Sequence, residues 1–133
     1  MTNYHVVADY IGARLDTSQL NCRFDFTKDG VDLDGKVVPV AANGWILSFA
    51  PFSRFDSGDN GGLPATDEAD YALMRVTQKV GGEGKRGWAK LSSTVPQPAA
   101  SDPLIILQHP EGSPLKLAIG TVLRLNDNMT RLR

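Results

Sequence analysis

The chain has 133 residues, of which 41% are hydrophobic and 22% are charged, and its formal net charge is −1. These values are typical of one globular domain and exclude global disorder. No block of basic residues is present, so the composition predicts neither a nucleic-acid partner nor an anionic membrane surface as partner.

The cellular location is predicted from what the sequence lacks. No stretch approaches the roughly 20 apolar residues of a transmembrane helix, and the first residues lack the basic and then apolar pattern of a signal peptide. Cys22 is the only cysteine, so no internal disulfide can form, which favours a reducing compartment. We therefore predict a cytoplasmic protein, with Cys22 as a small buried side chain.

The first half of the chain predicts one helix followed by strands. Apolar residues at helical spacing predict a short helix over residues 6–15. Residues 20–27 alternate between apolar and polar, which predicts a half-buried antiparallel strand. Further strands are expected over 36–40 and 45–50, and the Asn43-Gly44 pair between them favours a hairpin with a type I′ turn.

The second half continues the strand pattern. A loop rich in Ser, Asp, Asn, Gly and Pro covers residues 51–65, and a strand follows over 70–76. After a linker at 96–103, strands are expected over 104–108 and 115–125, and another begins at residue 130. Several short strands with one helix predict an all-β fold, either a barrel or a sandwich.

Two polar residues stand out against this pattern. His5 is an isolated histidine at the end of an expected strand, and a histidine in such a place usually has a purely structural role. Asp70 opens an apolar strand, and a carboxylate there is costly unless it is hydrogen-bonded or paired. An imidazole is one suitable partner, and such a pair fixes the tautomer of the histidine ring.

Two segments carry a family resemblance. Thr2-Asn3-Tyr4-His5-Val6-Val7 resembles the catalytic-histidine segment of trypsin-like serine peptidases, and Asp70-Tyr71-Ala72-Leu73-Met74-Arg75-Val76 resembles the segment with their triad aspartate. The order of histidine before aspartate also matches the chymotrypsin type. Residues 23–26, 102–112 and 115–118 resemble a bacterial and effector-associated branch of the family. The resemblance implies that His5 is the catalytic base, that Asp70 orients it, and that the substrate is a peptide or protein.

The resemblance also implies a fold. It predicts an incomplete chymotrypsin-like double β-barrel of antiparallel strands, with one short helix after the histidine segment. A partial N-terminal barrel is expected over residues 1–95 and the beginning of a C-terminal barrel over 96–133. Exposed strand edges of such half-built barrels favour oligomers or strand exchange.

One family feature is missing from the sequence. No Gly-x-Ser-Gly segment, which carries the nucleophile and its oxyanion hole, is present. Ser113 is followed by a proline where the family has glycine, Ser92 and Ser93 are expected in a loop, and His109 is expected to be structural or exposed. The nucleophile is expected roughly 15–40 codons beyond residue 133. The chain alone is therefore predicted to be inactive.

Two other functions stay open at this point. A non-catalytic relative would use the same cleft to bind a peptide or partner. A metal site formed by His5, His109 and Asp70 is a weaker alternative, because their spacing fits no compact ligand motif. No cofactor and no metal are predicted.

Overall fold

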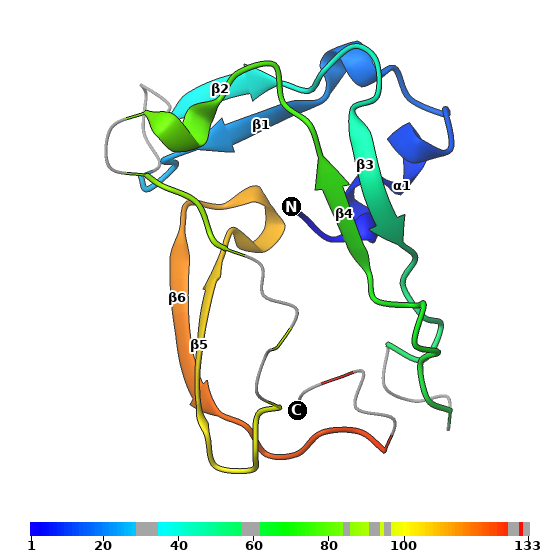
Figure 1. The fold of residues 1–133 in the computed structure, drawn as a ribbon, viewed down its shortest axis with the longest axis vertical. Helices are drawn as coiled ribbons and strands as arrows, with labels where there is room; N and C mark the ends of the chain where they lie inside the picture. Colours follow the sequence, from blue (N-terminus) through cyan, green and yellow to red (C-terminus); the bar gives the residue numbers. More distant parts are fainter. Residues whose placement is uncertain are drawn as a thin grey trace.

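The structure is a computed structural model that describes residues 1–28, 35–56, 62–83, 86–90, 94, 97–127 and 131. Within these residues the chain forms one α-helix and six β-strands (Figure 1). Their bounds are α1 Tyr4–Ile11, β1 Asn21–Phe24, β2 Lys36–Pro39, β3 Ile46–Ala50, β4 Tyr71–Met74, β5 Pro103–Gln108 and β6 Lys116–Thr121. Short 3₁₀-helices lie at η1 Thr17–Gln19, η2 Val80–Gly82 and η3 Pro110–Gly112.

Helix α1 packs against the sheet of β3 and β4. Its Val7 side chain is 1% exposed, whereas Val6 is 59% exposed, so one face of the helix is buried. The helix ends at Ile11 and is capped by Gly12, whose N–H donates to the carbonyl of Ala8 at 2.9 Å. It begins and ends earlier than the expected range of 6–15. It cannot continue to residue 15, because the backbone turns at Ala13, where φ is 55°.

Strands β1 and β2 form the first antiparallel sheet, with Cys22 opposite Val38. Val38 is completely buried. Cys22 is only half-buried, contrary to expectation, because it lines an open pocket of about 270 Å³ beside Phe24. Strand β1 is shorter than the expected 20–27, since Asp25 has a φ of 57°, which breaks the extended backbone.

Strands β3 and β4 form a second antiparallel sheet. The expected hairpin between residues 36–40 and 45–50 is wrong, because β2 pairs with β1 and β3 pairs with β4. Gly44 does have a positive φ of 59°, as a turn requires. A turn fixes only the local backbone, however, whereas the partner of each strand is set by burial of its side chains. A bridge between Val40 and Val76 links the two sheets.

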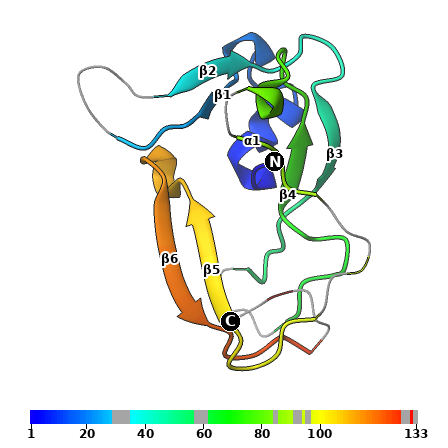
Figure 2. The same cartoon turned by 60° about the vertical axis from the view of Figure 1, so that its left-hand side comes forward.

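Strands β5 and β6 form a longer hairpin in continuous register from Pro103–Thr121 to Gln108–Lys116. This hairpin stands apart from β1–β4 in both views (Figures 1 and 2). Four of its aliphatic side chains are largely exposed: Ile105 65%, Leu107 68%, Leu117 58% and Ile119 75%.

The described residues form an antiparallel, mostly β structure with one short helix and no closed barrel. This confirms the expected all-β fold, which is consistent with a partial trypsin-like fold. The buried apolar side chains are small for the most part: Val7, Phe26, Val38, Val40, Ala50, Ala72 and Val122. The strand expected to begin at residue 130 lies almost wholly outside the described residues.

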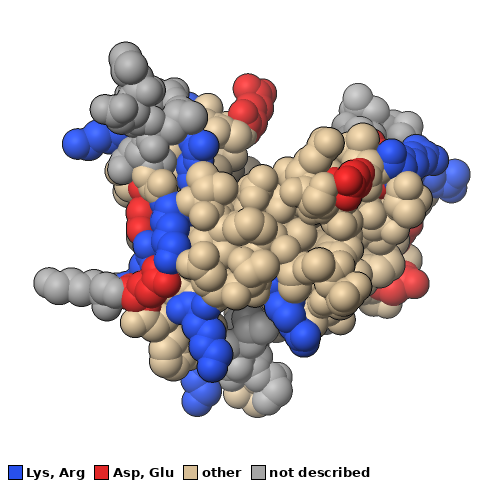
Figure 3. All heavy atoms as spheres, turned by 90° about the horizontal axis from the view of Figure 1, so that it is seen from above, with Lys and Arg blue, Asp and Glu red and all other residues tan. Residues whose placement is uncertain are grey.

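The charge distribution on the surface bears on the kind of partner. On the face in Figure 3, charged side chains of both signs surround a broad uncharged area, and basic residues do not gather into one stripe. None of the helices in the described part of the chain has the length and apolarity needed to cross a membrane.

Candidate active site

Asp70 lies immediately before β4, in an unusual backbone conformation. Its φ is 47°, in the left-handed region that aspartate tolerates better than most residues. Its N–H donates to the carbonyl of Pro51 at 2.9 Å. This bond ties the start of β4 to the loop that follows β3, so two loops meet at Asp70.

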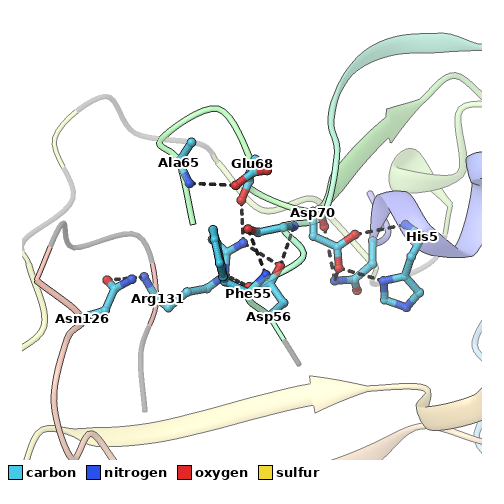
Figure 4. Close-up of polar contacts among 10 residues, drawn as sticks. His5, Phe55, Asp56, Ala65, Glu68, Asp70, Asn126 and Arg131 are labelled. Atoms are coloured by element: carbon cyan, nitrogen blue, oxygen red, sulfur yellow. Dashed lines mark hydrogen bonds and ion pairs between the residues drawn. The ribbon is translucent and has the colours of Figure 1, made fainter. Parts of the chain in front are cut away.

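The carboxylate of Asp70 binds the start of helix α1 through both oxygens (Figure 4). Oδ1 accepts the backbone N–H of His5 at 3.0 Å, and Oδ2 lies 2.8 Å from Nδ1 of the His5 ring. Oδ2 also accepts the side-chain amide of Asn3 at 3.0 Å. An ionised carboxylate only accepts hydrogen bonds, so Nδ1 carries the proton and Nε2 is the basic nitrogen of neutral His5.

These contacts follow from the position of the helix. The first backbone N–H groups of a helix have no partner within it, and Asp70 supplies one for His5. Asn3 occupies the N-cap position but makes no capping bond, because its amide turns to Asp70 instead. A carboxylate at a helix N-terminus is also favoured by the helix dipole.

Exposure and hydrogen bonding decide the charge of Asp70. Its side chain is 17% exposed and that of His5 is 58% exposed. Partial burial raises the pKa of Asp70, but hydrogen bonds from His5 and Asn3 outweigh it and hold the pKa below the ordinary value. Asp70 is therefore ionised at neutral pH and can hold the His5 ring in one orientation.

The ring of His5 lines an open groove of about 780 Å³. One wall is formed by the first residues of the chain, and the other by residues 107–112 at the end of β5 and in η3. The volume lies within the range typical of ligand sites. A segment far along the sequence thus faces the histidine across the groove.

A second polar cluster adjoins Asp70 (Figure 4). Arg131 donates to both carboxylate oxygens of Asp56, at 2.7 and 3.0 Å, and to the carbonyl of Glu68 at 2.5 Å. Asp56 in turn accepts the N–H of Ser53 at 2.9 Å, and Ser53 is 1% exposed. The cluster therefore joins residues 53–56 to residues 65–70.

The other candidates from the sequence have different contacts. His109 is exposed and lines the same groove as His5. Its ring stacks on Phe26, and its Nδ1 donates to the carbonyl of Ser113 at 3.0 Å. Ser113 follows η3 and does not line the groove of His5. Ser92 and Ser93 lie outside the described residues. In the part of the chain that is described, no three His, Cys, Asp or Glu side chains are arranged to hold a metal ion.

The sequence predicted the His5–Asp70 pair but gave no role to two residues near it, Asn3 and Arg131. Asn3 stood in the histidine segment without an assigned role, although an amide next to a helix start is a polar group that needs a partner. Arg131 contacts a residue 75 positions away. No periodicity or short motif could have revealed that contact.

Fold and site together define a β-rich protein with an ordered histidine–carboxylate pair on an open groove. Residues 1–132 match the family model of the trypsin-like peptidase domain. The chain therefore belongs to the trypsin-like peptidase domain family, as the resemblance predicted. A search of curated proteins and a search of solved structures found no match. The expected bacterial branch stays a prediction.

Proposed function

We propose that this chain carries the catalytic base and its orienting carboxylate of a trypsin-like serine endopeptidase. The observation that supports this role is the 2.8 Å contact between Nδ1 of His5 and Oδ2 of Asp70. It leaves Nε2 as the free basic nitrogen of a ring that lines the groove. Membership of the peptidase family implies a peptide or protein as the substrate.

The proposed reaction is acyl transfer. Nε2 of His5 takes the proton of a serine hydroxyl as its oxygen bonds to the peptide carbonyl carbon, and then gives that proton to the leaving amine. Water hydrolyses the acyl-enzyme in a second round of the same proton transfers. Asp70 keeps the ring oriented and stabilises the imidazolium. A general base contributes about 10²–10⁴-fold to such a reaction.

The serine of this proposal lies outside the 133 residues, because they contain no Gly-x-Ser-Gly segment. We expect this segment in the codons that follow residue 133. A chain with the base but without the nucleophile and oxyanion hole does not hydrolyse peptides. Activity therefore belongs to the protein that contains both.

The test uses a serine-directed phosphonate probe on the protein extended through the following codons. We expect labelling of one serine in the extended protein and none in the 133 residues. His5→Ala should abolish labelling, and Asp70→Asn should slow it roughly 10³–10⁴-fold. Asp67→Asn is the matched control, since Asp67 is exposed on the same loop and should label normally.

Two outcomes would contradict the peptidase role. Undiminished labelling in the His5→Ala variant would show that His5 is not the base. Another residue at the serine position would support the alternative of a non-catalytic module that binds peptides in the same groove. That alternative predicts peptide binding without hydrolysis.

We also propose that the exposed hairpin of β5 and β6 associates with a second copy of the chain. Its aliphatic side chains at positions 105, 107, 117 and 119 support this proposal. A cytoplasmic location, and the absence of nucleic-acid, membrane, metal and cofactor partners, stay predictions.

A further inference from the structure

We propose that Arg131 is a positioning residue for the Asp70–His5 pair. Its guanidinium joins the two loops that meet at Asp70 and holds them in one arrangement (Figure 4). The inference rests on the proposed role of Asp70 as the group that orients His5.

The contacts of Arg131 reach Asp70 along two routes. The first runs through Glu68, whose carbonyl accepts from Arg131 at 2.5 Å and which precedes Asp70 by two residues. The second runs through Asp56 to Ser53, on the loop whose Pro51 carbonyl accepts the N–H of Asp70. One side chain therefore constrains Asp70 from both sides.

Several local hydrogen bonds make each loop rigid enough to transmit this constraint. The N–H of Asp56 donates to the carbonyl of Ser53 at 3.0 Å. The N–H of Ala65 donates to Oε2 of Glu68 at 2.8 Å, and a hydrogen bond with Ser53 also lowers the pKa of Glu68. Arg131 thus acts on two preformed turns.

The geometry and burial of the ion pair make it stronger than an ordinary surface pair. The side chains of Arg131 and Asp56 are 27% and 28% exposed. Two N–H groups of Arg131 reach the two oxygens of Asp56, an arrangement that is stronger and more specific than a single contact. Lysine cannot reproduce it, because an ammonium group lacks the planar fork.

Asp70 also needs external support. A non-glycine residue at a φ of 47° is strained and persists only where its surroundings hold it. The carboxylates of Asp56, Glu68 and Asp70 all raise the pKa of Arg131, with the hydrogen bonds of Asp56 contributing most. Arg131 is therefore a permanent cation beside the acidic group that it positions.

The test compares Arg131→Lys and Arg131→Gln with Arg86→Gln in the 133-residue chain. Arg86 is the matched control, because it also contacts both carboxylate oxygens of one aspartate, Asp25, and its side chain is 23% exposed. The amide proton of His5 donates to Asp70, so its NMR shift during a pH titration reports the ionisation and position of the Asp70 carboxylate.

We expect both Arg131 variants to move the His5 amide shift and to bring the pKa of Asp70 closer to its ordinary value. Arg86→Gln should lower the melting temperature to a similar extent and leave the His5 signal unchanged. An effect of Arg131→Gln without one of Arg131→Lys would show that only the charge matters, which would overturn the positioning role. Unchanged His5 signals in both variants would also overturn it.

The readout is independent of the proposed reaction. Failure of the serine probe to label the extended protein would refute the peptidase role and leave the amide result intact. In an extended protein that does label, Arg131→Lys should slow labelling by about 10–100-fold, since small misplacements of a catalytic group have effects of this size. Asp56→Asn, which removes the negative charge paired with Arg131, should also slow labelling.

Discussion

The ionised carboxylate of Asp70 is bound by three donors, and protonation would remove part of this binding. The three donors are the backbone and ring of His5 and the amide of Asn3. Because the pKa of Asp70 is lower in the folded chain than its ordinary value of 3.8, ionisation favours the folded state. The stabilisation is complete above about pH 4 and is lost as the pH falls through the folded pKa.

Replacing Asp70 with asparagine should therefore lower the free energy of unfolding at neutral pH. The variant should also lose less of that free energy than the wild type when the pH falls. We expect a decrease in unfolding free energy of about 1–2 kcal/mol at pH 7, typical of losing hydrogen bonds to a charged group that is not fully buried. Urea unfolding of both proteins between pH 3 and 7 measures this. The difference in unfolding free energy between the wild type and Asp70→Asn should narrow toward pH 3. A constant difference across this range would show that the ionisation of Asp70 does not stabilise the folded chain. Asp67→Asn should unfold with the same free energy as the wild type.

At this scale the sequence predicted His5 and Asp70 because their segments are continuous and resemble a known family. It could not predict Arg131, since the contact with Asp56 depends on how distant loops fold together. Nor could it predict the left-handed backbone of Asp70, because the residue type permits that conformation without requiring it.

Strand β2 shows how burial differs between neighbouring residues of one element. Val38 is completely buried opposite β1, whereas Val37 is 48% exposed. Truncating a buried side chain removes apolar contacts and leaves a cavity, but truncating an exposed one does neither. The two positions share a strand and a residue type, so each is a control for the other.

We expect Val38→Ala to lower the free energy of unfolding by roughly 2 kcal/mol. Val37→Ala should change it by less than about 0.5 kcal/mol, as is usual for surface substitutions. Both lose the same β-branched side chain, so their difference isolates the effect of burial. Denaturant unfolding of both variants measures it, and equal losses would place Val38 outside the core.

Among the elements, the sequence located the strands better than their partners. Alternating residues and turns indicated each strand to within a few positions. The Asn43-Gly44 turn led to a wrong prediction of strand partners, because the turn joins two different sheets rather than two strands of one hairpin. Strand ends were also missed where one residue with positive φ stops the strand, as Asp25 does after β1.

For the whole molecule, the arrangement of sheets explains the small core. Three two-stranded sheets bury few large side chains in the described residues, and an isolated two-stranded hairpin is only marginally stable in water. The hairpin of β5 and β6 belongs to the segment expected to begin a second barrel. The division into 1–95 and 96–133 stays a prediction.

The exposed hairpin leads to the last prediction, which concerns self-association. Ile105 and Ile119 face each other across the two strands, so their side chains share one face. That face is rich in exposed aliphatic side chains, and β5 contains no charged residue that would oppose pairing with another strand. We therefore expect the 133-residue chain to form dimers or larger species at micromolar concentration.

Ile119→Lys should shift this equilibrium toward the monomer, because a charge buried between two copies is costly. Ile119 is 75% exposed, so the variant should keep its fold. Leu15→Lys is the control, as Leu15 is 48% exposed but lies outside the hairpin and should leave association unchanged. Sedimentation velocity at several concentrations measures the species. A wild-type chain that sediments as a monomer throughout would show that this face does not bind a second copy.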